Sequence, residues 1–222
     1  MSKSWAEQPY TLLPLPGQPG QPTSKDANIL AIAVEMAQAH NIILRGMSSI
    51  YHQCEHVKAP ADITDFTTYI RSWGDMVYHH HSTEELEAFP KWDEITRAAG
   101  AQGSVTSRNV EQHHAFELGF EELRTYAAEV QEERAVYDGK KLKALLEDFA
   151  PIFNEHLHDE VKMILDLDGY DGAALKKVMD DTAQKSISTA DPNVVIPLIF
   201  GCCDKTAPGA ANFHLSRFFY RI

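Results

Sequence analysis

The chain has 222 residues, with 32 Asp and Glu against 20 Lys and Arg and a formal net charge of −12. A surface that acidic repels phosphates and anionic lipid, so we expect neither a nucleic-acid partner nor a membrane partner. No apolar run reaches the length of about 18 residues that a membrane-spanning helix needs. The N-terminus lacks the apolar core of a signal peptide, and three cysteines do not make a disulfide framework, so we expect a cytoplasmic protein.

Composition divides the chain into three parts. Residues 1–22 form an extended lead-in, because the Pro and Gly of residues 11–22 prevent a helix. Residues 23–185 show helical periodicity almost throughout and no sustained alternation typical of a sheet. Residues 186–222 hold an apolar run and an aromatic end, so we expect a C-terminal extension packed on the helical domain.

Helices are predicted, in chain order, over residues 26–56, 62–88, 92–99, 107–138, 140–167 and 172–182. The prolines at positions 60 and 90 and the glycines at positions 100, 103, 139 and 172 set most of these limits. Four of the helices are long, and the others are short. The fold class is therefore all-α, an up-down-up-down four-helix bundle.

Each long helix has an apolar stripe with spacings of three and four, and each stripe contains a histidine. Three stripes also carry a glutamate four residues later, which lies on the same helix face. In a bundle with short turns, a rise of 1.5 Å per residue places these groups within about two helical turns of one level. The inward-facing set is His40, His80, Glu84, His113, Glu117, His156 and Glu160.

Seven such side chains without partners would cost roughly 1–3 kcal/mol each, which is too much for a fold stabilised by about 5–15 kcal/mol. A metal is the natural partner. Four imidazoles and three carboxylates exceed the needs of one zinc ion, and mixed imidazole and carboxylate donors suit iron or manganese. Seven ligands favour two metals over one. An acidic helical bundle with incidental polar core pairs is the structural alternative.

The chain resembles the hemerythrin-like, or HHE cation-binding, domain family in four segments. These are HNIILRG at 40–46, HHHSTEELEAFP at 79–90, EQH at 111–113 and HLHDE at 156–160. The resemblance covers about residues 23–167 and implies a four-helix bundle with a non-haem di-iron centre. Matched position by position, it implies that all seven inward-facing residues are metal ligands.

Two positions depart from hemerythrin itself. Glu117 stands where hemerythrin has a histidine, and Glu160 stands where it has the shorter aspartate. Anionic oxygen donors stabilise higher oxidation states of iron, which favours O2 activation or redox chemistry over reversible O2 carriage. Alternatively, Glu117 is not a ligand, and one iron keeps an open position for O2 or substrate.

The remaining histidines are interpreted as surface or supporting residues. His52 and His56 lie away from the face of His40, His79 and His81 flank His80, and His81 should point toward a helix interface or solvent. His114 and His158 are expected near the site or on the surface, and His214 lies in the C-terminal extension.

Three functions remain open at this point, and for one of them, iron storage or stress repair, the sequence offers nothing specific. The first is an oxidoreductase or oxygenase in which two iron ions, or manganese in their place, activate O2 on a small-molecule substrate. The second is a non-catalytic module that binds or senses O2, nitric oxide or iron. A cavity that reaches the metals favours the enzyme.

Overall fold

The computed structural model describes residues 8–204, and all regular structure in that range is helical. No strand occurs in this part of the chain, so the predicted all-helical fold is confirmed. The elements are α1 (Ala27–Gln53), α2 (Pro60–Thr83), the π-helical turn η2 (Glu84–Ala88), α3 (Phe89–Ala98), α4 (Ser107–Gln131), α5 (Gly139–Asp166), α6 (Gly172–Thr189) and α7 (Pro192–Cys202).

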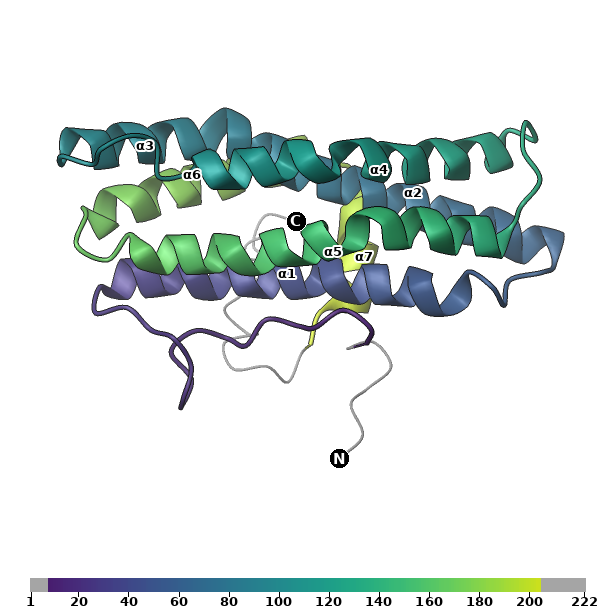
Figure 1. Cartoon of the computed structure of the whole chain (residues 1–222), viewed down its shortest axis with the longest axis horizontal. Helices are drawn as coiled ribbons and strands as arrows, with labels where there is room; N and C mark the ends of the chain where they lie inside the picture. Colours follow the sequence, from purple (N-terminus) through teal and green to yellow (C-terminus); the bar gives the residue numbers. More distant parts are fainter. Residues whose placement is uncertain (1–7, 205–222) are drawn as a thin grey trace.

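The four long helices α1, α2, α4 and α5 lie side by side along the long axis of the molecule (Figure 1). The α1–α2 and α4–α5 connections are at one end, and α3 and α6 lie toward the other. Helix α4 packs most extensively on α5, α5 also packs on α1, and α2 packs on α4. The core is therefore enclosed by the faces that the four helices turn toward one another.

Aspartates cap the starts of several helices. Asp26 accepts hydrogen bonds from the backbone N–H groups of Asn28 and Ile29, and Asp138 accepts them from Lys140 and Lys141. Asp171 and Asp191 cap α6 and α7 in the same way. A side-chain acceptor satisfies N–H groups that have no partner inside the helix, so these residues fix where each helix begins.

The core between the long helices combines apolar side chains with a band of aromatic rings. Trp73 is fully buried, donates a hydrogen bond from Nε1 to the carbonyl oxygen of Ile43 at 3.0 Å, and packs edge-on against Phe120 and Phe153. A Cβ atom on Gly46 would lie 2.5 Å from the Trp73 ring. The absence of a side chain at Gly46 therefore allows α1 and α2 to approach closely beside the band.

Pro90 is expected to end or kink the second long helix, and of these alternatives the ending is wrong. The helix passes from α2 through η2 into α3 without interruption. In an α-helix, the proline ring clashes with the carbonyl four residues earlier. The wider π turn, in which the Phe89 N–H bonds to the carbonyl oxygen of Glu84, accommodates the proline at the start of α3.

The helix predicted over residues 107–138 ends earlier, at Gln131. Glu133 adopts a positive φ of 57°, which ends helical geometry. The Tyr126 hydroxyl then donates to the carbonyl oxygen of Val136 and accepts from the backbone N–H of Asp138. These bonds hold the loop between α4 and α5 against α4.

The segments on both sides of the bundle contact it. Asn41 exchanges two hydrogen bonds with the backbone of Leu13, at 2.8 and 3.0 Å, which fixes the lead-in on α1. Helix α7 packs on α1 and α2. The aromatic end expected to pack on the bundle, including His214, lies outside the described residues.

Among the described helices, α1 is long and apolar enough to cross a membrane by length and composition alone. The most apolar window of α1 is 56% buried inside the protein, and the helix carries the buried polar residues His40 and Asn41. These are properties of a core helix, which passes the same test.

Candidate metal centre

Seven His and Glu side chains from α1, α2, η2, α4 and α5 converge in the bundle as two groups. Within each group the candidate ligand atoms lie within 4.8 Å of one another. The carboxylate group consists of His40, His80, Glu84 and Glu160, and the tri-histidine group consists of His81, His113 and His156.

In the carboxylate group, nitrogen and oxygen atoms face one another without forming hydrogen bonds. His40 Nε2 lies 3.3 Å from Glu160 Oε2, and His80 Nε2 lies 3.1 Å from Glu84 Oε1. Both imidazole nitrogens and all four carboxylate oxygens are buried and have no hydrogen-bond partner. Donor atoms that converge in this way without bonding one another are arranged as ligands of a cation.

In the tri-histidine group, the rings of His81, His113 and His156 are in contact. The ring centroids of His81 and His113 and those of His113 and His156 are both 4.4 Å apart. His113 Nε2 lies 3.0 Å from His156 Nε2, and His81 Nε2 is buried without a partner. All three rings therefore direct nitrogen atoms into one small volume.

Glu160 lies between the two groups. Its Oε2 atom is 3.3 Å from His40 Nε2 and 3.9 Å from His156 Nε2. The His80 and His81 rings are also adjacent, with centroids 5.2 Å apart. The groups are therefore neighbours that share a carboxylate, rather than separate sites.

Hydrogen bonds at the opposite nitrogen orient three of the imidazoles. His40 Nδ1 lies 2.7 Å from the carbonyl oxygen of Leu157, and His113 Nδ1 lies 2.5 Å from Glu85 Oε1. His156 Nδ1 is 3.4 Å from Gln112 Oε1. Because each of these oxygens accepts, each Nδ1 carries the proton and each Nε2 presents a lone pair to the site.

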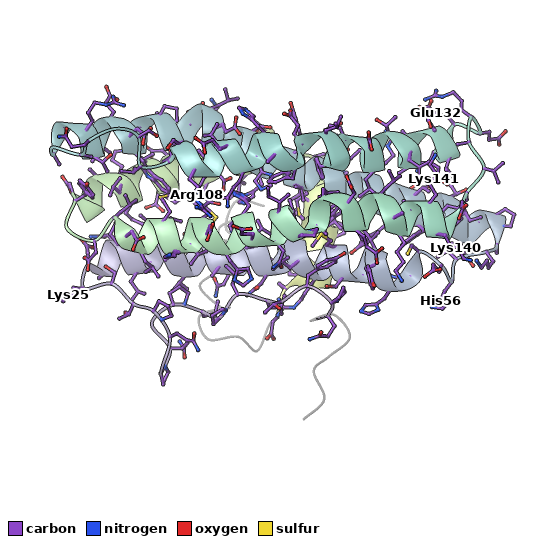
Figure 2. All side chains as sticks on the ribbon, viewed as in Figure 1. Lys25, His56, Arg108, Glu132, Lys140 and Lys141 are labelled. Carbon is purple, nitrogen blue, oxygen red and sulfur yellow. The ribbon has the colours of Figure 1, made fainter. Side chains whose placement is uncertain are left out.

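A chain of polar contacts links His156 to the surface. The Gln112 amide donates to Asp159 Oδ2 at 2.9 Å, and Arg108 donates to the same oxygen at 2.7 Å. Arg108 is labelled in Figure 2, where its side chain lies on α4 beside α5. This series of contacts holds the Gln112 amide with its oxygen toward His156.

In two pairs of consecutive residues, one side chain contacts the carboxylate group and the other contacts the tri-histidine group. His80 faces the carboxylate group while His81 faces the tri-histidine group. Glu84 joins the carboxylate group, and Glu85 bonds to His113 of the other group. Both glutamates begin the π turn, a feature that occurs frequently at functional sites because it alters side-chain directions along a helix.

Burial decides the charges of these side chains in the protein without metal. Desolvation lowers the pKa of His80, His81 and His156 well below the ordinary histidine value, and lowers that of His113. Desolvation, followed by the charge of Glu160, raises the pKa of Glu84 well above its usual range. These four imidazoles are therefore neutral, the state in which histidines ligate metals.

The donor set fits metal cations. The facing lone pairs of His113 and His156 repel each other unless a positive charge lies between them, and the low pKa values of both residues disfavour a proton there. The orphaned oxygens of Glu84 and Glu160 need the same compensation. Neutral imidazoles and carboxylates at one place are the ligands of iron, manganese or zinc.

The structure brings together six of the seven residues predicted from the sequence: His40, His80, Glu84, His113, His156 and Glu160. Glu117 is exposed and belongs to neither group. Phe116 takes the core-facing position on that turn of α4, where its ring contacts His81 and Phe153. One turn after His113, the helix therefore presents an aromatic ring instead of a carboxylate.

His81 was missed as a site residue. Of the two expected directions, a helix interface or solvent, the structure shows the first, because His81 is buried against His113 of α4 and His156 of α5. The sequence does contain a signal that could have identified His81: the adjacent pair His80 and His81 is followed four residues later by the adjacent pair Glu84 and Glu85. Neighbours on a helix differ by about 100° in direction, so two consecutive residues can reach two adjacent sites.

The other described histidines stand apart from both groups. His52 Nε2 bonds to the carbonyl oxygen of Gln8, and His158 Nε2 to that of Thr11. His56 lies at the end of the bundle where α5 begins, near Lys140 (Figure 2). Neither His52 nor His56 belongs to a candidate metal group among residues 8–204.

Comparisons with known proteins agree with this donor set. The model of the hemerythrin HHE cation binding domain matches residues 31–167. The dimeric xanthone biosynthesis cluster protein R11 of Cryptosporiopsis sp. (strain 8999) is 31% identical over 204 residues, which cover 91% of this chain and 75% of the relative. No solved structure matches significantly. The chain therefore belongs to the hemerythrin HHE cation-binding domain family, whose members bind metal cations.

Proposed function

We propose that the protein holds two iron ions, with manganese as the possible substitute, and acts as an O2-reactive oxidoreductase on a small molecule. The carboxylate group would hold one ion and the tri-histidine group the other, with Glu160 close to histidines of both groups. The observation that carries the proposal is the set of buried, unpartnered donor atoms in two adjacent groups. Four long helices in up-down-up-down order supply these donors.

In this proposal, bound iron supplies the ability to exchange electrons with O2. The protein supplies orientation and charge. Hydrogen bonds from Nδ1 to Leu157, Glu85 and Gln112 keep three imidazoles aimed inward. Glu84 and Glu160 supply anionic donors that favour higher oxidation states.

The tri-histidine group has an accessible side. A pocket of about 270 Å3 is lined by His81 and His113 together with Tyr78, Glu85, Glu117 and others. Glu117 lines this pocket without belonging to either donor group, so it would border the approach of an external molecule to the tri-histidine group. This arrangement supports reaction with an external molecule over a fully ligated structural site.

The substrate class is supported by the relative. The name of that fungal protein associates it with xanthone biosynthesis, and its similarity extends over most of this chain. Because xanthones are aromatic, we propose that this protein acts on an aromatic small molecule. A role confined to binding or sensing O2, nitric oxide or iron is the alternative.

The decisive experiment combines elemental analysis, a visible spectrum and exposure of the reduced protein to O2. We expect about two iron atoms per chain, as two groups of three to four donors require. We also expect oxidation by O2 that removal of O2 does not reverse. A reversible spectral change would identify a binding module, and a chain without metal after reconstitution would contradict the proposal.

A further inference from the structure

A second cavity reaches the centre from the side of the carboxylate group. It has a volume of about 130 Å3 and lies where α6 and α7 cover α1 and α2. Its walls are mostly aliphatic, and His80 lies at its edge with a side chain that is 20% exposed. The apolar lining includes Ile42, Ile43, Met76, Ile187, Val195 and Ile199.

Few polar groups line this cavity, and one of them already makes a hydrogen-bond contact within the protein. His79 Nε2 lies 3.0 Å from the carbonyl oxygen of Ser186, a contact that ties α2 to α6. No Asp, Glu, Lys or Arg lines the cavity. A charged molecule would lose its hydration there without gaining a partner, so the lining selects uncharged, apolar groups.

The size of the cavity limits the occupant further. An apolar cavity of about 150 Å3 engineered in another protein stays dry and binds benzene. A cavity of 130 Å3 with aliphatic walls therefore suits one aromatic ring. A fused polycyclic molecule would place only one of its rings inside.

The helices that cover the cavity lie beyond the part of the chain that matches the family model. The family match ends at residue 167, whereas α6 spans Gly172–Thr189 and α7 spans Pro192–Cys202. The bundle supplies His80, and residues of α6 and α7 line the other side of a partly open apolar space beside it.

We propose that this cavity is a substrate-binding site that takes one uncharged aromatic ring and holds it beside His80. The inference rests on the proposed function, since it assigns a position to the substrate of the same centre. It also gives the α6–α7 segment a specificity role that the bundle alone does not have.

The test uses the full metal-loaded chain with fluorobenzene as probe, followed by 19F NMR. Ile199→Phe places a ring inside the cavity and should weaken fluorobenzene binding by about tenfold or more. Ile196→Phe is the matched control, because Ile196 is on the same helix but does not line the cavity, and should bind as the wild type does. Ile187→Ala enlarges the cavity and should strengthen binding of 1-fluoronaphthalene.

Metal analysis of the same samples separates the two proposals. Equal fluorobenzene affinity in the wild type and Ile199→Phe, or no binding to a chain that holds its iron, overturns the cavity assignment alone. Fluorobenzene binding that follows the expected pattern in a chain without metal overturns the proposed function alone. Val195→Phe replaces Ile199→Phe if circular dichroism shows that the latter is unfolded.

Discussion

The tri-histidine group and the carboxylate group, the two halves of the centre, differ in the charge of their buried side chains and in the hydrogen bonds that these side chains make. The tri-histidine group uses neutral side chains, and Glu85 and Gln112 at its edge bond to His113 and His156. The carboxylate group buries Glu84 and Glu160, whose four oxygens have no hydrogen-bond partner. The first half can remain uncharged without metal, whereas the second half needs positive charge or a proton.

This difference indicates how the halves depend on a cation. A buried, unpaired carboxylate costs far more than a neutral imidazole, so metal binding stabilises the carboxylate half most. Glu160, which approaches both halves, couples them. Four predictions, from the largest expected effect to the smallest, test this view.

Glu160→Gln should have the largest effect, because Glu160 contacts both halves. We expect elemental analysis to show metal content falling from about two ions per chain toward none as an anionic donor common to both ions is lost. Glu155→Gln is the matched control on α5, since the Glu155 side chain is 59% exposed and that of Glu160 is fully buried. Full metal content in Glu160→Gln would show that the halves are independent of this carboxylate.

His81→Ala should remove about one of two metal ions, because a group of three imidazoles keeps only two. Glu117→Ala should leave the metal content unchanged, because Glu117 is exposed outside both groups. Elemental analysis of the two variants shows which of the two residues, His81 or Glu117, is a metal ligand. If Glu117→Ala loses metal and His81→Ala does not, the assignment of His81 as a ligand in the tri-histidine group is wrong.

Glu85→Gln should weaken metal binding at the tri-histidine group by about 10- to 100-fold, the usual effect of changing a carboxylate that orients a ligating histidine. The carboxylate group should keep its affinity, so a metal titration should become biphasic. Glu87→Gln on the same turn, which pairs with Lys91 and Lys185, is the control. A uniform loss in both phases would argue against separate halves.

The metal-free protein should lose stability as the pH falls from about 7.5 to 5.5. Burial lowers the pKa of His80, His81, His113 and His156, so the unfolded chain binds more protons below about pH 6.5. Their contribution is therefore present above that pH and lost below it. The raised pKa of Glu84 acts in the opposite direction, but it is one group against four.

Thermal melts of chelator-treated protein measure this dependence. Glu84→Gln should make the loss on acidification steeper, because it removes the opposing contribution of Glu84. A melting temperature that is constant or rises between pH 7.5 and 5.5 would contradict the assignment of neutral, buried histidines. Metal-loaded protein should melt at a higher temperature over the same range.

The sequence by itself determined the helical fold and most of the site. Except at the end of α4, stripes with spacings of three and four located the long helices within a few residues, since amphipathic periodicity and Asp, Pro and Gly signals act locally. The same periodicity placed six His and Glu residues on faces that the structure brings together. These features follow from the geometry of a single helix.

Tertiary structure alone decided the rest. The rotation of α4 turned Phe116 inward and left Glu117 outside, although both positions lie near the face of His113. The π turn allowed the helix to continue through Pro90, and α6 and α7 formed one side of a cavity beside His80. Such features depend on how several helices pack together, where shifts of a fraction of a turn decide which neighbouring side chain is buried.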